Sequence, residues 1–216
     1  MTNLEQPRRI GVLGGTFDPV HNGHLHIANE LRAALGLERV VWVPAGRPPH
    51  KAGQIVSSDI DRLAMLKLAL ASSPCDKISA IDIDRAGPSF TADTLEILSV
   101  QLAPARLVFL MGEDSLRDLP NWHDPERILR VAELAVAGRP NVDADLSAVA
   151  LAVPGLQGRV HLTPTEETPV SSSDIRQRVR EDRPIHGLVP PEVEAYIRDH
   201  GLYKSSAARA GQRNAR

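Results

Sequence analysis

Cysteine is almost absent from the sequence, which has one residue of this type, Cys75, among 216. One thiol cannot form an internal disulfide, and without Cys or His neighbours at ligand spacing it makes no zinc site, so we predict a buried thiol with no chemical role. An excess of one charge is also lacking. The 25 basic and 27 acidic residues leave a net charge of −2, which provides no positive field for nucleic acid or an anionic membrane.

Long hydrophobic runs are missing as well. No segment approaches the roughly 18 apolar residues of a membrane helix, and residues 1–10 (MTNLEQPRRI) contain no signal-peptide core. We therefore expect a cytoplasmic protein with neither a membrane nor a nucleic acid as partner. With 42% apolar residues the chain can build one core, so we predict a single domain over residues 1–203 and a disordered tail over residues 204–216.

Two common phosphate-binding motifs are absent. Gly11, Gly14 and Gly15 do not have the G-x-G-x-x-G spacing, and no glycine-rich loop ends in Gly-Lys-Ser/Thr. Residues 10–24 (IGVLGGTFDPVHNGH) nevertheless run from an apolar segment through a glycine turn into a helical pattern. A helix N-terminus that follows a first strand presents unpaired N–H groups to an anion, so this stretch is a candidate anion site.

Two histidines stand at the start of this predicted helix. His21 and His24 are three residues apart, so their imidazoles would lie on one helical face at the positive end of the helix dipole. Single histidines and Gly-Gly turns are common in purely structural positions. Here the glycines, a hydroxyl, a Phe-Asp-Pro turn and both histidines form one continuous string, which favours a site for a phosphate chain.

Apolar, strand-like segments alternate with helical patterns along the whole chain. The expected strands are residues 8–13, 39–44, 77–83, 106–111, 133–137 and, shorter, 160–162. Helices are expected to begin with Asp59, with Ser89 or Thr91, at Asp124-Pro125, at Ser171–Asp174 and at residue 190, whereas residues 141–158 have no clear pattern. The alternation predicts an α/β fold, a Rossmann-like doubly wound parallel sheet with a C-terminal helical segment and a site at its carboxyl edge.

The string GGTFDPVHNGH resembles the signature of the nucleotidyltransferase superfamily, whose H-x-G-H histidines bind ATP phosphates. A second segment, VSSSDIR at residues 170–176, resembles that superfamily's C-terminal I-S-S-T-x-I-R motif, with Val170 and Ser173 in place of Ile and Thr. In the superfamily this motif is a helix N-terminus with an arginine that clamps the triphosphate. Arg176 takes that position here.

Three further segments resemble one family within this superfamily, the nicotinate-nucleotide adenylyltransferases. They are PPHK at residues 48–51, GPSFTADTL at residues 87–95 and GLVPPEVEAYIRDHGLY at residues 187–203. Pantetheine-phosphate adenylyltransferases are shorter and generally have Thr at the position of His21, so they match less well. One departure from the family is Glu113, which replaces the alanine of a common G-A-D segment.

The resemblance implies transfer of AMP from MgATP to nicotinate mononucleotide, which yields deamido-NAD and pyrophosphate in NAD biosynthesis. The 5′-phosphate of the acceptor is already an anion at neutral pH, so the protein needs no general base and must align the substrates and neutralise charge. No acidic cluster with ligand spacing is present, so we expect no metal ligands in the protein and Mg²⁺ bound through the ATP phosphates. The implied partners are ATP and nicotinate mononucleotide, and a homo-oligomer is left open.

The resemblance also implies roles for individual residues. The catalytic phosphate contacts would come from His21, His24 and Arg176. The other ATP contacts would come from Gly14, Gly15, Thr16, Phe17, Gly112, Asp114 and Ser172. The acceptor would be bound by Lys51, Thr91, Trp122 and Arg139. A plain structural role is the alternative for four of them: surface charge for Lys51 and Arg139, a helix cap for Asp114 and core packing for Trp122.

We expect nicotinate mononucleotide to be preferred over its amide, because a helix N-terminus near Thr91 with no acidic side chain nearby favours a carboxylate. Three alternatives stay open. One is an adenylyltransferase that acts on nicotinamide mononucleotide or phosphopantetheine, and another is a nucleotide sensor without catalysis. The third, an RNA-linked role by analogy with class I aminoacyl-tRNA synthetases, lacks the expected size, anticodon-binding domain and basic surface.

Overall fold

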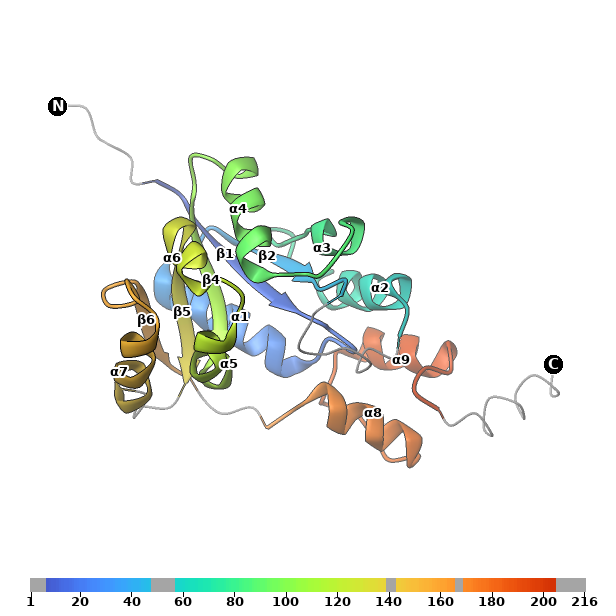
Figure 1. The fold of residues 1–216 in the computed structure, drawn as a ribbon. Coiled ribbons are helices and arrows are strands. Elements are labelled where there is room, and N and C mark those ends of the chain that lie inside the picture. The colour runs from blue at the N-terminus through green and yellow to red at the C-terminus, as the bar shows by residue number, and fades with distance from the viewer. Residues whose placement is uncertain (1–6, 48–56, 139–142, 166–168, 205–216) are drawn as a thin grey trace, which may run out of the picture.

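The computed structural model describes residues 7–47, 57–138, 143–165 and 169–204. These residues form a six-stranded, all-parallel sheet with the strand order β3-β2-β1-β4-β5-β6 (Figure 1). The strands are β1 (Arg9–Gly15), β2 (Arg39–Pro44), β3 (Lys77–Ile78), β4 (Arg106–Gly112), β5 (Ala132–Gly138) and β6 (Val160–Pro164). The α/β, doubly wound fold predicted from the alternating pattern is confirmed.

Helices cover both faces of the sheet. They are α1 (Asn22–Leu35), α2 (Asp59–Ala69), α3 (Ile81–Asp84), α4 (Thr91–Gln101), α5 (Glu113–Asp118), α6 (Pro125–Val131), α7 (Asp143–Ala152), α8 (Ser172–Arg180) and α9 (Pro191–Asp199), with a 3-10 turn, η2 (Leu119–Asn121), after α5. The four inner strands, β1, β2, β4 and β5, are therefore buried on both faces, whereas the edge strands β3 and β6 are not. In β1, Leu13 joins the core under α1, α2 and α9, whereas Ile10 and Val12 join the core under α4, α6 and α7. Burial on both faces explains why these four inner strands are apolar runs without polar alternation.

The prediction of the third strand is wrong over most of its length. Residues 77–83 were expected to form one strand, but β3 ends at Ile78, after which the Ser79 N–H donates to the Trp42 carbonyl at 2.9 Å and α3 begins. Asp82 in α3 is buried and accepts a hydrogen bond from Thr94 Oγ1 at 2.6 Å. That tertiary contact favours a helical turn over a short alternating apolar segment at the edge of the sheet.

Two helix N-caps lie at other residues than the sequence predicted. Ser58, one residue before Asp59, caps α2 by accepting from the Asp61 N–H, and Phe90 rather than Ser89 or Thr91 precedes α4, with no side-chain cap. The caps at Asp124 and Ser171 lie where the sequence placed them. Cap positions vary by a residue because neighbouring polar side chains compete for the same N–H groups.

The prediction of a buried Cys75 is wrong, because this thiol is exposed. It lies in the turn between α2 and β3, where the adjacent Asp76 carboxylate binds the Val40 N–H at 3.0 Å and Trp42 Nε1 at 3.2 Å. The buried group in this turn is therefore Asp76, whose side chain is 3% exposed. The segment that had no clear pattern contains α7, and no described helix is long and apolar enough to cross a membrane.

The strand order places a topological switch between β1 and β4. Chain connections leave these two adjacent strands in opposite directions, β1 toward β2 and β4 toward β5, so their carboxyl ends open a crevice between diverging loops. Ligands of open α/β sheets bind at such a point. The loop after β1 and the segment after β4 are thus brought together although about a hundred residues separate them in the sequence.

Candidate active site

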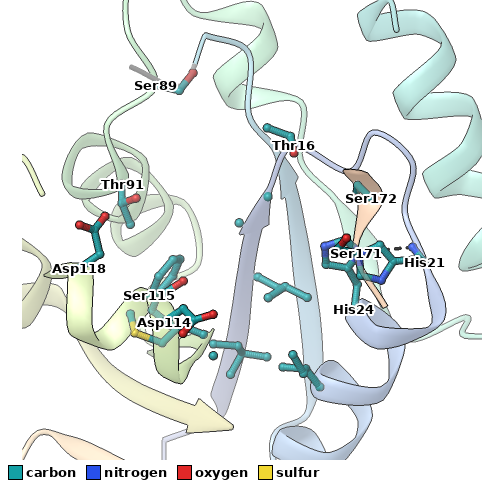
Figure 2. Close-up of a pocket in the computed structure, with 18 of the residues that line it drawn as sticks. Thr16, His21, His24, Ser89, Thr91, Asp114, Ser115, Asp118, Ser171 and Ser172 are labelled. Atoms are coloured by element: carbon teal, nitrogen blue, oxygen red, sulfur yellow. Dashed lines mark hydrogen bonds between the residues drawn. The ribbon is translucent and has the colours of Figure 1, made fainter. Parts of the chain in front are cut away.

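A cleft of about 600 Å³ opens at this switch point. Its floor is formed by the ends of β1 and β4, from Leu13 to Thr16 and from Phe109 to Gly112. Figure 2 shows two walls that face each other across these strands: His21, His24, Ser171 and Ser172 on one side, and Thr91, Asp114, Ser115 and Asp118 on the other. The first wall carries nitrogen donors and hydroxyls, and the second carries carboxylates near aromatic rings.

Gly15 ends β1 where the chain turns sharply. A Cβ at this position would lie 2.9 Å from the Phe17 ring, so only glycine fits. Phe17 itself is fully buried with a left-handed backbone (φ 49°), and its ring contacts the rings of His24 and Trp42 at centroid distances of 5.0 and 5.6 Å. Its side chain is absent from the described cleft lining, so it supports the loop from below, whereas Gly14, Gly15 and Thr16 line the cleft.

His21 and His24 are brought together at the first turn of α1, as their spacing predicted. Their rings stack at a centroid distance of 3.6 Å, and the His21 backbone N–H donates to His24 Nδ1 at 3.3 Å. Nδ1 of His24 is therefore an acceptor, and the neutral ring carries its proton on Nε2. Burial lowers the pKa of His21 to about 4, so this imidazole is neutral at pH 7 and can donate one N–H without carrying charge.

The N-terminus of α8 reaches the same loop from the other end of the chain. Ser172 Oγ donates to the Pro19 carbonyl at 2.9 Å, and Arg176 Nη1 donates to the Asp18 carbonyl at 2.7 Å. Both residues also line the cleft. Arg176 Nη2 additionally donates to Ser173 Oγ at 3.3 Å, while its buried Nε has no hydrogen-bond partner within the described residues. The two predicted phosphate ligands therefore also hold the backbone of the loop that carries the histidines.

A layer of buried polar residues lies beneath the β1–α1 loop, and no sequence pattern predicted it. The Asp18 carboxylate is buried and accepts from the Tyr203 hydroxyl at 2.8 Å, and burial together with Asp18 raises the pKa of Tyr203, so its proton stays in place. Arg62 is also fully buried; it donates to the Thr16 carbonyl at 2.7 Å and to Asp59 Oδ1 at 2.5 Å. No local pattern marks these residues, because their partners lie up to 185 positions away.

Aromatic and polar side chains share the second wall. Trp122 packs edge-on against Phe109 at a centroid distance of 6.0 Å and also lines the cleft. Thr91, the first residue of α4, lies on the same wall. This end of the cleft can accept a planar ring against Trp122 and an acceptor group at the N-terminus of α4.

The expectation that no acidic side chain lies near Thr91 is wrong. Asp118, at the end of α5, lines the same wall of the cleft as Thr91 (Figure 2), and its Oδ2 accepts from Trp122 Nε1 at 3.2 Å. Asp118 stands four residues before Trp122 in the sequence, and the 3-10 turn η2 between them brings the two side chains together.

Asp114 and its neighbours form the part of this wall nearest to β4 and β5. Asp114 is almost fully exposed and its Oδ1 pairs with Arg117 Nη1 at 2.6 Å, while Arg117 Nη2 pairs with Glu113 Oε2 at 3.0 Å. The Glu113 side chain packs directly over Gly138 at the end of β5, where a Cβ would overlap it. Glu113 therefore turns away from the main cleft, and a second hollow of about 610 Å³ extends the cleft past Asp114 to Gly138 and Thr165.

Lys51 and Arg139, predicted to bind the acceptor, lie outside the described residues. Within the described residues no group of three or more His, Cys, Asp or Glu side chains could hold a metal ion.

Comparison with known proteins identifies similar chains. A family model described as cytidylyltransferase-like matches residues 12–178. A protein of Thermomicrobium roseum named probable nicotinate-nucleotide adenylyltransferase is 49% identical over 200 residues, which cover 93% of this chain and 94% of that protein. A protein of Roseiflexus sp. (strain RS-1) with the same name is 47% identical over 195 residues, covering 90% of this chain and 98% of that protein.

Solved structures agree on the fold. Plasmodium falciparum nicotinic acid mononucleotide adenylyltransferase complexed with NaAD has a TM-score of 0.73 and 17% identity, covering 91% of this chain and 97% of that chain. The same enzyme complexed with APC has a TM-score of 0.70 and 18% identity, with the same coverage.

Proposed function

This chain belongs to the nicotinate-nucleotide adenylyltransferase family, and we propose that it transfers AMP from ATP to nicotinate mononucleotide in the cleft between β1 and β4. The products are deamido-NAD and pyrophosphate, so the enzyme serves NAD biosynthesis. The observation that carries the proposal is the two-ended cleft: the stacked imidazoles of His21 and His24 together with Arg176 at one end suit a triphosphate, and Trp122 at the other end suits a pyridine ring.

The reaction is an in-line displacement at the α-phosphorus of ATP. An oxygen of the acceptor's 5′-phosphate forms the new bond, and the bond from the α-phosphorus to the bridging oxygen breaks, with pyrophosphate as leaving group. The nucleophile is already an anion, so no residue removes a proton. The protein's part is to align both substrates and to stabilise charge on the phosphoryl oxygens.

The histidine pair supplies that stabilisation. His21 and His24 donate N–H groups from the first turn of α1, where the helix dipole is positive. A neutral His21 avoids two adjacent cations in one stack, which would repel each other before ATP binds. Thr16 and the N–H groups at Gly14 and Gly15 assist, and Arg176 with Ser172 binds the outer phosphates from the opposite side.

The second wall holds the two nucleosides. Trp122 stacks on the pyridine ring, and the N–H groups at Thr91 receive the nicotinate substituent, while Asp114, beside Gly112, accepts hydrogen bonds from ATP ribose hydroxyls. Mg²⁺ neutralises phosphate charge when it is bound. Asp114 pairs with Arg117, and in this proposal the ATP phosphates carry the ion. The contributions of Lys51, Arg139 and Phe17 and the cytoplasmic location stay predictions.

Steady-state assay of pyrophosphate release tests the proposal. The wild-type protein with ATP and nicotinate mononucleotide should release pyrophosphate and form deamido-NAD, and His24→Ala should lower kcat on the order of 10²–10³-fold, the effect of removing one preorganised donor. His186→Ala is the matched control, because the His186 side chain is 85% exposed and lies in no described cleft wall. Turnover of His24→Ala within tenfold of wild type would contradict the role of the histidine. No release with any acceptor would favour a nucleotide sensor.

A further inference from the structure

Arg62 is a charged side chain buried beneath the floor of the cleft. It belongs to α2 and its relative exposure is 0%, and its Nη1 donates to the Thr16 carbonyl at 2.7 Å. Its Nη2 donates to Asp59 Oδ1 at 2.5 Å, one turn earlier on the same helix. Thr16 lines the cleft (Figure 2), whereas Arg62 is not among the described lining residues. The guanidinium therefore binds the rim of the cleft from the interior of the protein.

The β1–α1 loop has four backbone carbonyls that are bound to donors outside it. They accept as follows: Gly15 from the Ala45 N–H at 2.8 Å, Thr16 from Arg62, Asp18 from Arg176 at 2.7 Å, and Pro19 from Ser172 Oγ at 2.9 Å. Arg176 and Ser172 also line the cleft, so a bound triphosphate can compete for them. Arg62 is fully buried and out of the reach of a ligand, so its bond persists when the cleft is filled.

The peptide between Thr16 and Phe17 is the one that Arg62 controls. It precedes a residue with a left-handed backbone, since Phe17 has a φ of 49°. In a trans peptide the C=O and N–H groups point in opposite directions, so the bond to Arg62 turns the carbonyl inward and the Phe17 N–H away from Arg62. Rotation of this peptide would turn the carbonyl oxygen outward, where its partial negative charge would repel a phosphate.

We propose that Arg62 is a positioning residue for adenylyl transfer: it holds the Thr16 carbonyl away from the ATP phosphates and so fixes Thr16 at the rim of the cleft. The inference rests on the proposed function, because it requires the triphosphate to bind along the β1–α1 loop. Arg62 acts through the backbone and contacts neither substrate. Its loss should therefore weaken the use of ATP and leave the contacts of the acceptor unchanged.

The experiment compares Arg62→Met with a matched control, Arg9→Met. Arg9 lies in the first position of β1, at the end of the strand opposite to Thr16. Its Nη1 donates to the Leu35 carbonyl at 3.1 Å and its Nη2 to Glu133 Oε2 at 3.0 Å. Each substitution thus removes one bond to a backbone carbonyl and one to a carboxylate, but only one of the two carbonyls belongs to the cleft.

We expect kcat/KM for ATP to fall about 10²-fold in Arg62→Met, the cost of a misplacement of about 1 Å at the reacting groups. The KM for the acceptor should stay within about threefold of wild type, and Arg9→Met should leave kcat/KM for ATP within the same limit. Calorimetric titration with ATP separates positioning from folding. Loss of positioning raises the Kd at a stoichiometry near one, whereas loss of folded protein lowers the stoichiometry and leaves the Kd unchanged.

Arg62→Lys keeps the test decisive if methionine prevents folding. Lysine carries one charged nitrogen without the planar fork, so it cannot hold the Thr16 carbonyl and Asp59 in the present geometry together. Its kcat/KM for ATP should lie about tenfold below wild type, the effect of one weakened hydrogen bond, and above that of a folded Arg62→Met.

Two kinds of result would overturn the inference in different ways. A kcat/KM for ATP within about threefold of wild type in folded Arg62→Met, or in Arg62→Lys where the methionine variant does not fold, overturns it and leaves adenylyl transfer intact. An equal fall in Arg9→Met does the same. No pyrophosphate release from the wild-type protein with any acceptor overturns the proposed function and this inference with it.

Discussion

At the scale of single residues, the site depends on polar groups buried beneath it. His21 illustrates the cost of such a group, because burial lowers the pKa of its imidazole to about 4. The unfolded chain titrates this histidine near pH 6.5, so between pH 6.5 and 4 it binds a proton that the folded chain does not. Protonation of the unfolded state then favours unfolding.

We predict that the free energy of unfolding falls as the pH is lowered through this window. The loss from His21 is on the order of 3 kcal/mol by pH 4 and is absent above about pH 7. Urea unfolding at pH 4, 5, 6 and 7.5 measures it, with His21→Gln as comparison. If the variant loses as much stability as the wild type over the same range, His21 is not the group responsible.

Tyr203 provides a second residue-scale prediction. Tyr203→Phe removes the hydroxyl that donates to the buried Asp18 carboxylate, which costs about 1–3 kcal/mol of stability because a buried charge loses a donor. The β1–α1 loop carries Thr16 and the histidines, so the KM for ATP should rise more than the KM for the acceptor.

The control is Tyr196→Phe. Its hydroxyl also donates to an aspartate, Asp61 Oδ1 at 3.0 Å, but in a partly exposed position, so less than about 1 kcal/mol should be lost. Urea unfolding and separate titrations of ATP and acceptor measure both variants. Equal stability losses in the two variants would show that burial of Asp18 is not the cause.

At the scale of elements, the departure at Glu113 is matched by a feature of β5. Glu113 opens α5 and its side chain fills the space over Gly138, where β5 ends. An alanine at 138 would overlap that side chain. The start of α5, which follows β4, and the end of β5 are thus in contact through Glu113 and Gly138.

Gly138→Ala should therefore destabilise the protein by up to about 1 kcal/mol, because the flexible Glu113 side chain must turn aside and give up its ion pair with Arg117. The same substitution in a Glu113→Ala background should cost almost nothing, because the space is then open. A double-mutant cycle by urea unfolding measures the coupling energy. A coupling energy near zero would mean that the two elements do not constrain each other.

At the scale of the whole molecule, the β1–α1 loop joins distant parts of the chain. Its carbonyls and carboxylate bind Arg62 of α2, Ser172 and Arg176 of α8, and Tyr203 beyond α9. Figure 1 shows α2, α8 and α9 gathered at one end of the molecule, away from α6 and α7. A ligand on this loop should stabilise the entire fold.

We predict that ATP with Mg²⁺ raises the thermal unfolding midpoint. At a concentration 100 times its Kd, ATP should add about 2.7 kcal/mol to the free energy of unfolding. Differential scanning calorimetry at increasing ATP measures the shift. Arg176→Lys, which keeps one positive charge but not the planar fork, should show a smaller shift at equal ATP. An unchanged midpoint at millimolar ATP would argue against binding at this loop.

Much of the molecule could be predicted from local patterns. Five of six strands and the start of α8 follow from apolar runs and capping residues, and the i, i+3 spacing of His21 and His24 predicted that both lie on one helical face, where the structure shows their rings stacked. The third strand failed because a buried contact between Asp82 and Thr94 outweighed a short alternating pattern. The exposure of Cys75 could not be predicted either, since burial depends on which neighbours the fold brings to a turn.

The sequence by itself determined the fold class, the position of the β1–α1 loop and the family, because these depend on periodicity and on motifs within a few neighbouring residues. Only the tertiary structure decided which distant groups meet: Tyr203 with Asp18, Arg62 with Thr16, Glu113 with Gly138, and Asp118 with the wall that holds Thr91. The physical reason is that a buried polar group is stabilised by whichever donor or acceptor the packing places within hydrogen-bond distance. Sequence separation does not limit that choice.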